Sequence, residues 1–138
     1  LVCQNGEGSM IHRFAVKVFY EDTDMGGIVY YANYLKFIER ARSTLIEEVG
    51  IDQLQMKERG VVFAVRRVKA DYIAPAIMGD KLTVVSETVS AKPARWIIKQ
   101  DILRQDTEIF TAEVTLVAIG PKGRPVRLPA ELCRIFGS

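Results

Sequence analysis

Hydrophobic and polar side chains alternate along residues 13–20, RFAVKVFY, so that the aromatic and valine side chains fall on one face. A period of two is typical of a half-buried strand. The next residues, 21–27, read EDTDMGG and break this alternation. Because two adjacent glycines allow backbone angles that are closed to other residues, we expect a tight loop there.

From Tyr30 onward the apolar positions recur at steps of three and four residues, the period of an amphipathic helix. Asn33 is a suitable N-cap and Gly50 a suitable C-terminal glycine, so the pattern predicts a helix of about 16 residues between them. A second, shorter helix is expected over residues 52–58. The apolar stripe of the long helix, which we expect at the centre of the domain, consists of Tyr30, Tyr34, Phe37, Ile38, Ala41, Leu45 and Val49.

The remainder of the chain is rich in β-branched residues divided by turn sequences, which predicts consecutive strands at 61–73, 81–90, 95–104 and 108–119. The tail at 124–132 is interrupted by prolines and is expected to be irregular. Short connections favour antiparallel neighbours. The expected fold is therefore α+β, with a five-stranded antiparallel sheet wrapped around one central helix. Such a sheet has an exposed edge strand, so pairing with a second copy is also expected.

Composition narrows the classes of function. The chain has 19 Lys and Arg against 17 Asp and Glu, a net charge of +2, and the basic residues are scattered, so we expect no nucleic-acid partner. No apolar run approaches the roughly 20 residues that cross a bilayer, so we expect no integral membrane segment. Two cysteines without a spacing motif, and no export signal, favour a reduced, cytoplasmic protein.

The first nine residues, LVCQNGEGS, show no period and precede Met10. We interpret residues 1–9 as a remnant of cloning and residues 10–138 as a single domain. The sequence contains one histidine, His12, no histidine pair and no cysteine cluster, so neither a metal site nor a cofactor is expected. A Ser-His-Asp hydrolase is excluded because the nucleophile motif and a suitably placed histidine are both missing.

The segment from Tyr20 to Arg42, YEDTDMGGIVYYANYLKFIERAR, carries the candidate chemistry. Three acids in four residues are followed by a glycine pair and then by the first turn of the predicted helix. This order brings a carboxylate close to unpaired backbone N–H groups at the positive end of a helix dipole. Such N–H groups can polarise a carbonyl oxygen while the carboxylate attacks the carbonyl or takes a proton from water. The segment therefore suits acyl chemistry.

This segment resembles the signature of the hotdog-fold acyl-CoA thioesterases, and is closest to the YbgC-like branch of the 4-hydroxybenzoyl-CoA thioesterase family. The match runs through residues 18–42, and the order of elements over 11–129, including DYIAPA and RPVRLP, agrees with it. The resemblance implies a hotdog fold and hydrolysis of coenzyme A thioesters. It also implies a homodimer or a dimer of dimers, with active sites at the subunit interface.

By position in the motif, the resemblance implies that Asp24 is the family's catalytic aspartate, which acts as general base or as nucleophile toward the thioester carbonyl. The backbone N–H that polarises the thioester carbonyl corresponds to that of Tyr31. Related members often have His where this chain has Tyr31, so any role of this residue depends on its backbone. Glu39 matches an acidic position two turns further along the same face, and a surface residue paired with Arg42 or Ser43 is the alternative. Gly27, in the glycine pair, is expected to contribute to substrate binding.

Coenzyme A carries several phosphate charges, which need cations. The family uses basic residues near the turn AKPAR, so Lys92 and Arg95 are the first candidates for substrate binding. Arg66, Arg67 and Lys69 are second choices, and the alternative for all of these residues is an ordinary solvated charge at a strand edge.

Two other functions remain open from the sequence. A hotdog β-hydroxyacyl dehydratase usually pairs a histidine with an acid, but the single histidine lies outside the loop and helix of the motif. A non-catalytic acyl-CoA binding module is the other alternative. The feature against it is Asp24, because binding alone does not require a negative charge next to a thioester.

Overall fold

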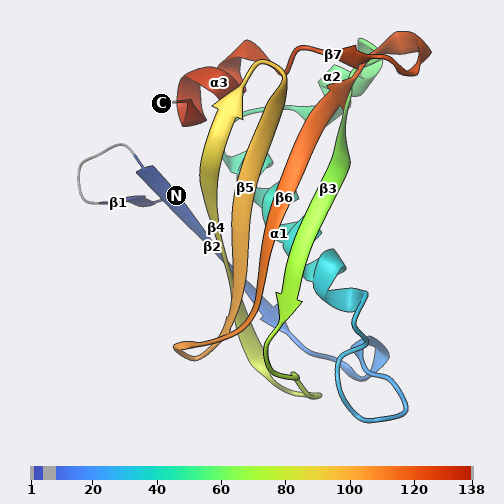
Figure 1. The fold of residues 1–138 in the computed structure, drawn as a ribbon, viewed down its shortest axis with the longest axis vertical. Coiled ribbons are helices and arrows are strands. Elements are labelled where there is room, and N and C mark those ends of the chain that lie inside the picture. Colours follow the sequence, from blue (N-terminus) through green and yellow to red (C-terminus); the bar gives the residue numbers. More distant parts are fainter. Residues whose placement is uncertain (1, 5–8, 138) are drawn as a thin grey trace.

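The computed structural model describes residues 2–4 and 9–137, and in them an antiparallel sheet curves around a long helix (Figure 1). Two short 3₁₀ turns, η1 (Tyr20–Asp22) and η2 (Pro121–Gly123), interrupt the loops. The strands are β1 (Val2–Gln4), β2 (Ser9–Lys17), β3 (Val62–Tyr72), β4 (Lys81–Lys92), β5 (Arg95–Arg104), β6 (Thr107–Ile119) and β7 (Pro125–Val126), and the helices are α1 (Asn33–Glu48), α2 (Gln53–Glu58) and α3 (Ala130–Phe136).

The sheet has the order β1-β2-β4-β5-β6-β3, with β7 paired to β6. The four strands predicted after the helices are confirmed within two residues at each end. The expectation that short connections make successive strands antiparallel neighbours is wrong for β3, which pairs with β6 rather than with β4. Residues 73–80 carry the chain across the end of the sheet to β4, which pairs with β2. Strand β3 is therefore an edge strand.

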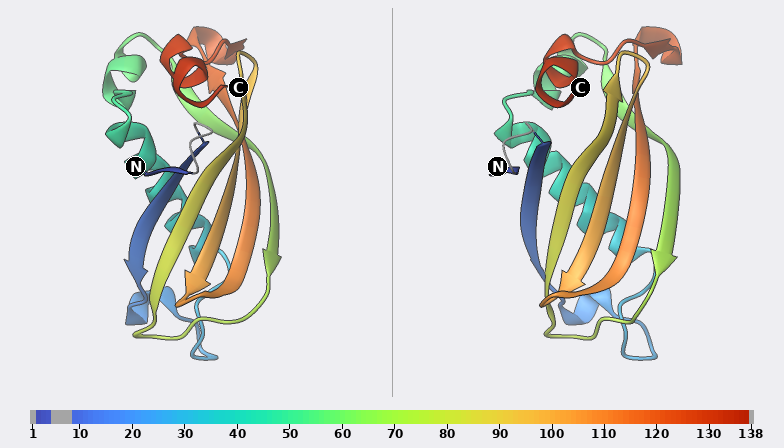
Figure 2. Two further views of the ribbon diagram at one scale, coloured as in Figure 1. Left: turned by 90° about the vertical axis from the view of Figure 1, so that its left-hand side faces the viewer. Right: turned by 60° about the vertical axis from the view of Figure 1, so that its left-hand side comes forward.

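Helix α1 lies along the concave face of the sheet (Figure 2). It spans 16 residues, as predicted. Its fully buried side chains, including those of Phe37, Ile38 and Ala41, pack with Trp96 and Phe110 from the sheet in one core. Burying each large apolar side chain contributes about 1.5–3 kcal/mol. Of the predicted stripe, Tyr30 is the exception, because it precedes the helix and is half exposed.

The ends of the helices follow the expected chemistry in part. Gly50 adopts a positive φ of 90° directly after α1, and the Asp52 side chain caps α2 by accepting from the Gln55 N–H at 3.0 Å. The prediction that Asn33 is the N-cap of α1 is wrong. Ala32 occupies that position without a side-chain cap, and Asn33 is the first helical residue. The side chain of Asn33 is directed to the preceding loop instead.

Both ends of the chain contain structure that the sequence pattern did not predict. Strand β1 pairs with β2, so the backbone of residues 2–4 belongs to the sheet. The interpretation of residues 1–9 as a cloning remnant stays a prediction, and residues 1 and 5–8 lie outside the described part of the chain. The expectation of an irregular tail is wrong, because β7 pairs with β6 and α3 buries Leu132 completely. The Phe136 ring also stacks on Trp96, at 5.3 Å between centroids.

A buried polar network ties α1 to the middle of the sheet. Gln100 is fully buried and its amide nitrogen donates to the Ile38 carbonyl and to the Ser86 hydroxyl, at 2.9 Å each. Its amide oxygen accepts from the Arg42 guanidinium at 3.0 Å. Burial lowers the pKa of Arg42. Because each of these groups has lost water, the network is costly to break at any one member.

Replacing Gln100 by Leu is expected to lower the free energy of unfolding by about 2–4 kcal/mol, because the Ser86 hydroxyl and a guanidinium N–H lose their partners inside the protein. Urea denaturation followed by circular dichroism measures the change. Gln55→Leu, at an exposed position of α2, is the matched control and should stay within about 0.5 kcal/mol of the native chain. Equal stability of the two variants would contradict the importance of the network.

Candidate active site

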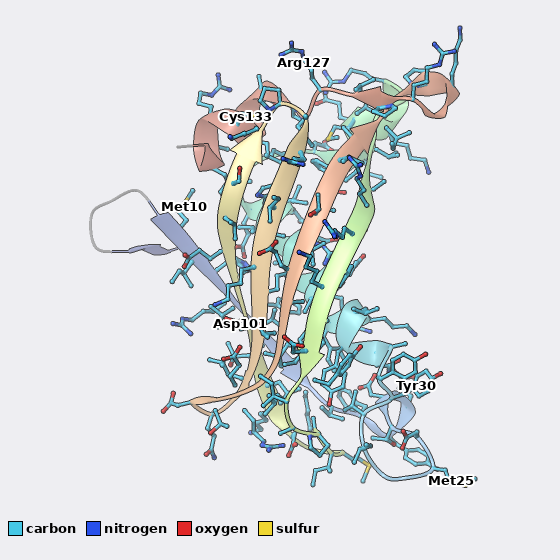
Figure 3. The ribbon with its side chains drawn as sticks, viewed as in Figure 1. Met10, Met25, Tyr30, Asp101, Arg127 and Cys133 are labelled. Atoms are coloured by element: carbon cyan, nitrogen blue, oxygen red, sulfur yellow. The ribbon has the colours of Figure 1, made fainter. Side chains whose placement is uncertain are left out.

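The acidic loop lies at one end of the sheet, beside the end of β3 and the start of α1. Met25 and Tyr30 mark this end in Figure 3, and Cys133 and Arg127 lie at the opposite end. Two isolated bridges hold the loop, Thr23 to Val29 and Ile28 to Ile77. Strand β2 ends at Lys17, earlier than the predicted end at residue 20, and the Phe19 N–H donates to a side chain within the loop.

The first part of the loop is organised around Asp22, whose side chain is buried. One carboxylate oxygen accepts from the Phe19 N–H at 2.9 Å, and the other from the Asn33 side-chain amide at 3.1 Å. The Asp22 carbonyl accepts from the Tyr30 N–H at 2.9 Å. Asp22 therefore ties both ends of the loop to the first residue of α1.

Asp24 lies at the exposed turn of the loop. Its Oδ1 accepts from the Gly26 N–H at 2.8 Å, and its carbonyl accepts from the Gly27 N–H at 3.0 Å. Gly27 has a φ of 79°, in the left-handed region that favours glycine. The glycine pair therefore closes a tight turn, as predicted, and holds the Asp24 carboxylate in one orientation.

Tyr31 lies between the loop and α1, with its side chain 62% exposed. Within residues 2–4 and 9–137, no group accepts a hydrogen bond from its backbone N–H. Its carbonyl accepts from the Tyr72 hydroxyl at 2.9 Å. A free amide two residues before a helix is the kind of donor that can stabilise a developing negative charge. The backbone role expected for Tyr31 is thus compatible with its local geometry.

Asp24 and Tyr31 line the same pocket, which has a volume of about 400 Å³. Its walls are mostly aromatic and aliphatic, and come from the loop, the start of α1 and the end of β3. The pocket is lined by Asp24, Ile28, Val29, Tyr30, Tyr31, Tyr34, Tyr72, Ile73, Ala74 and Pro75. Burial raises the pKa values of the Tyr34 and Tyr72 hydroxyls, so both remain protonated near neutral pH. The pocket therefore combines one carboxylate with neutral donors and apolar walls.

Glu39 does not share this pocket within one chain. It lines a neighbouring pocket of about 540 Å³, together with Arg42 of α1 and Val65 and Val68 of β3. Glu39 is exposed, and its charge acts on the buried Arg42 by raising the Arg42 pKa, against the larger lowering by burial. No hydrogen bond joins the two side chains in the described part of the chain.

The candidate phosphate ligands fall into two groups. Arg95 shares a pocket of about 230 Å³ with all three second choices, Arg66, Arg67 and Lys69, on the outer face of the sheet. A bulge shifts the pairing of β3 with β6 between Val65 and Arg67. Lys92 is exposed where β4 ends and does not line that pocket. Because Lys92 pairs with Arg95 at the far end of the β4–β5 hairpin, both lie at the opposite end of the sheet from Asp24 in the same chain.

The single histidine is far from the acidic loop. His12 is buried on β2, and its Nε2 is 2.8 Å from the Glu48 carboxylate at the last residue of α1. Asp24 lies near the other end of this helix, which is about 24 Å long at 1.5 Å per residue. In the described residues, no three His, Cys, Asp or Glu side chains come together as metal ligands, and no helix is long and apolar enough to cross a membrane.

Sequence reasoning missed two features of this site. Nothing in the local pattern shows that Asp22 and Asn33 bond to each other across 11 residues. The segment DYIAPA was part of the resemblance, but it did not indicate that Tyr72 reaches the backbone of Tyr31. Both contacts depend on how the loop, α1 and β3 meet in space. The only sequence signal for these two contacts was the extended resemblance to the family, which assigned no role to Asp22, Asn33 or Tyr72.

Comparison with known proteins identifies relatives of this chain. The family model of the Thioesterase-like superfamily matches residues 18–136. The acyl-CoA thioester hydrolase YbgC of Escherichia coli O6:H1 is 35% identical over 128 residues, which cover 91% of this chain and 96% of the relative. The acyl-CoA thioesterase YbgC of Haemophilus influenzae is 36% identical over 126 residues, 89% of this chain and 92% of the relative.

Solved structures agree in fold. The crystal structure of a probable thioesterase from Bartonella henselae is 31% identical and has a TM-score of 0.83, covering 87% of this chain and all (100%) of that one. A 1,4-dihydroxy-2-naphthoyl-CoA thioesterase from Synechocystis has a TM-score of 0.84 at 21% identity, covering 91% of this chain and 96% of that one. This second likeness supports the fold alone.

The antiparallel sheet curved around one long helix agrees with the hotdog fold of the solved thioesterase structures. The chain belongs to the Thioesterase-like superfamily. The resemblance to the hotdog-fold acyl-CoA thioesterases, the α+β hotdog fold and the enzyme class are confirmed. The residues that act in catalysis and the oligomeric state stay predictions.

Replacing Asp22 by Ala is expected to lower the free energy of unfolding by about 2–4 kcal/mol, because the Phe19 N–H and the Asn33 amide lose their acceptor at a buried position. Asp106→Ala, in the exposed turn between β5 and β6, removes the same group from the surface and should change stability by less than about 0.5 kcal/mol. Urea denaturation of both variants measures the difference. If Asp22→Ala were as stable as the control, Asp22 would not organise the loop.

Proposed function

We propose that this protein hydrolyses acyl-CoA thioesters to the free acid and coenzyme A in the pocket lined by Asp24 and Tyr31. The observation that carries the proposal is that Asp24 lines the same pocket as Tyr31, whose backbone N–H has no acceptor among the described residues. Relatives that are named acyl-CoA thioester hydrolases, and that align over most of this chain, support the choice of substrate.

In the proposed mechanism, the Tyr31 N–H donates to the thioester carbonyl oxygen and stabilises the negative charge that develops there. Removing such a donor typically costs about 2.7–4 kcal/mol of transition-state stabilisation. Asp24 acts on the carbonyl carbon in one of two ways. As a general base it takes a proton from water, whose oxygen attacks the carbon; as a nucleophile it forms a mixed anhydride that water then hydrolyses. In both, the carbon–sulfur bond breaks and the coenzyme A thiolate leaves.

The site has no imidazole, because the only histidine bonds Glu48 at the other end of α1. A thioester is suited to such a site, since sulfur donates poorly into the carbonyl and leaves the carbon more electrophilic than in an ester. The position of His12 also argues against the dehydratase alternative, which needs a histidine beside the acid. Glu39 lines a separate pocket in one chain, so we assign it no step.

We also propose that two copies of the chain pair along β3. Among the described strands, β3 pairs only with β6, so its other edge is free. Val62, Val65 and Val68 are exposed along its 11 residues. A long free edge with apolar side chains invites strand pairing, and two-fold symmetry makes such pairing of identical strands antiparallel.

Antiparallel pairing bears on substrate binding. It would place the beginning of the second copy's β3 beside the end of this chain's β3, where Tyr72 and the Asp24 pocket lie. The cluster of Arg66, Arg67, Lys69 and Arg95 lies at the middle of β3, and Glu113 lines the same pocket. Pairing along β3 would bring the cations of the second copy's β3 beside this chain's β3. We propose that this cluster binds the phosphates of coenzyme A.

Replacing Asp24 by Asn is expected to lower kcat by at least about 100-fold, because the variant can neither take the proton nor attack the carbonyl. Release of free coenzyme A from a panel of acyl-CoA substrates, followed with a thiol reagent, measures the rate. Glu21→Gln, an exposed acid three residues earlier, is the control and should keep the native rate. Equal rates in Asp24→Asn and the native protein would overturn the mechanism.

Replacing Val65 and Val68 together by Lys is expected to convert the dimer to a monomer, because like charges would face each other across the two-fold axis. Sedimentation velocity measures the mass. Val89→Lys, at an exposed position of β4, is the control and should leave the dimer intact. A native chain that sediments as a monomer would contradict pairing along β3.

A further inference from the structure

Tyr72 is the last residue of β3, and its hydroxyl donates to the Tyr31 carbonyl at 2.9 Å. Tyr72 and Tyr31 are 41 residues apart in the sequence. In the described part of the chain, no other group donates to this carbonyl. Tyr31 precedes α1, so the hydrogen bonds of the helix do not hold it. The bond from Tyr72 is therefore the direct restraint on the carbonyl side of this residue.

The Tyr72 ring itself is held by the core. It meets the rings of Tyr34 and Phe110 edge-on, at 5.4 and 5.1 Å between centroids. Phe110 is fully buried and lies directly opposite Tyr72 in the pairing of β3 with β6. Edge-to-face pairs of this kind are favourable beyond the area that they bury. The Tyr72 ring thus packs against Tyr34 of α1 and Phe110 of β6, and it also meets the Tyr31 ring edge-on at 6.4 Å between centroids.

The backbone on the other side of Tyr31 is restrained independently. The Tyr30 N–H donates to the Asp22 carbonyl at 2.9 Å, and the Tyr30 carbonyl accepts from the Asn33 N–H at 2.8 Å. These bonds hold the peptide unit that carries the Tyr31 N–H, and the Tyr72 hydroxyl holds the next unit. The direction of the free N–H depends on both restraints, since they limit the two rotatable angles at Tyr31.

We propose that Tyr72 is a positioning residue for thioester hydrolysis, whose hydroxyl holds the Tyr31 backbone so that its N–H is directed at the substrate carbonyl. This inference rests on the function proposed above. Burial raises the pKa of the Tyr72 hydroxyl, so it keeps the proton that it donates across the neutral range. Preorganised donors of this kind are effective because they need no reorganisation as charge develops.

Tyr72→Phe removes the hydroxyl and keeps the ring packing, so the variant is expected to fold normally. The bond is exposed, and its loss is expected to lower kcat by about 3- to 10-fold, or about 0.7–1.4 kcal/mol, with KM changed less than twofold. Tyr20→Phe, an exposed tyrosine outside the pocket, makes the same chemical change and should keep the native kcat. An unchanged kcat in Tyr72→Phe, or a change in KM alone, would overturn the inference.

Carbonyl infrared spectroscopy separates this role from a general effect on stability. An acyl-CoA with a ¹³C-labelled thioester carbonyl is bound to the Asp24→Asn variant, which does not turn it over. A hydrogen bond from the Tyr31 N–H lowers the carbonyl stretching frequency. In Asp24→Asn/Tyr72→Phe the frequency should return part of the way to its value in water. An equal shift in both variants would overturn the role of Tyr72. The absence of any shift in Asp24→Asn alone would overturn the role of Tyr31 and thus the proposed function.

Discussion

The position of α1 on the concave face of the sheet determines where everything else in the site can lie. The helix is fixed along its length by its buried apolar stripe and in its middle by Gln100, which bonds both the helix backbone and Arg42. Rotation or sliding of the helix would expose apolar surface and unpair three buried polar groups. The start of α1 therefore meets the end of β3 at one place only, and the loop that carries Asp24 has to close there.

At that place the protein uses side chains in place of a conventional helix cap. Asn33 is the first helical residue and bonds Asp22, while Ala32 at the cap position supplies no side-chain acceptor. An acceptor at the cap would satisfy N–H groups at the start of the helix. The Tyr31 N–H precedes the cap position and is not one of these groups, and among the described residues it has no acceptor. The buried Asp22 holds the loop on this side through the Phe19 N–H and the Asn33 side chain.

Most elements could be predicted because their signals are local. The period of the helix, Gly50 at its end and the alternation of β4, β5 and β6 are visible in short windows of sequence. The edge position of β3 could not be predicted, because residues 73–80 cross the sheet end and pairing with β6 is a non-local contact. The tail was predicted to be irregular because of its prolines, but two of its leucines, Leu128 and Leu132, are buried in the core. Asp24 and Tyr31 could be predicted because an extended motif contains them. The hydrogen bonds of Asp22 and Tyr72 join residues that are distant in the sequence, so no motif indicates them.

The bulge in β3 has a consequence for the distribution of charge. In a regular strand neighbouring side chains point to opposite faces, so one of Arg66 and Arg67 would be turned toward the core. The shift of pairing at this point lets both arginines line the outer pocket with Arg95. The extra backbone residue thus places two arginines, rather than one, on the outer face of this short stretch of strand. A chain with a net charge of only +2 in this way gathers four cationic side chains around one carboxylate, that of Glu113, through backbone geometry rather than composition.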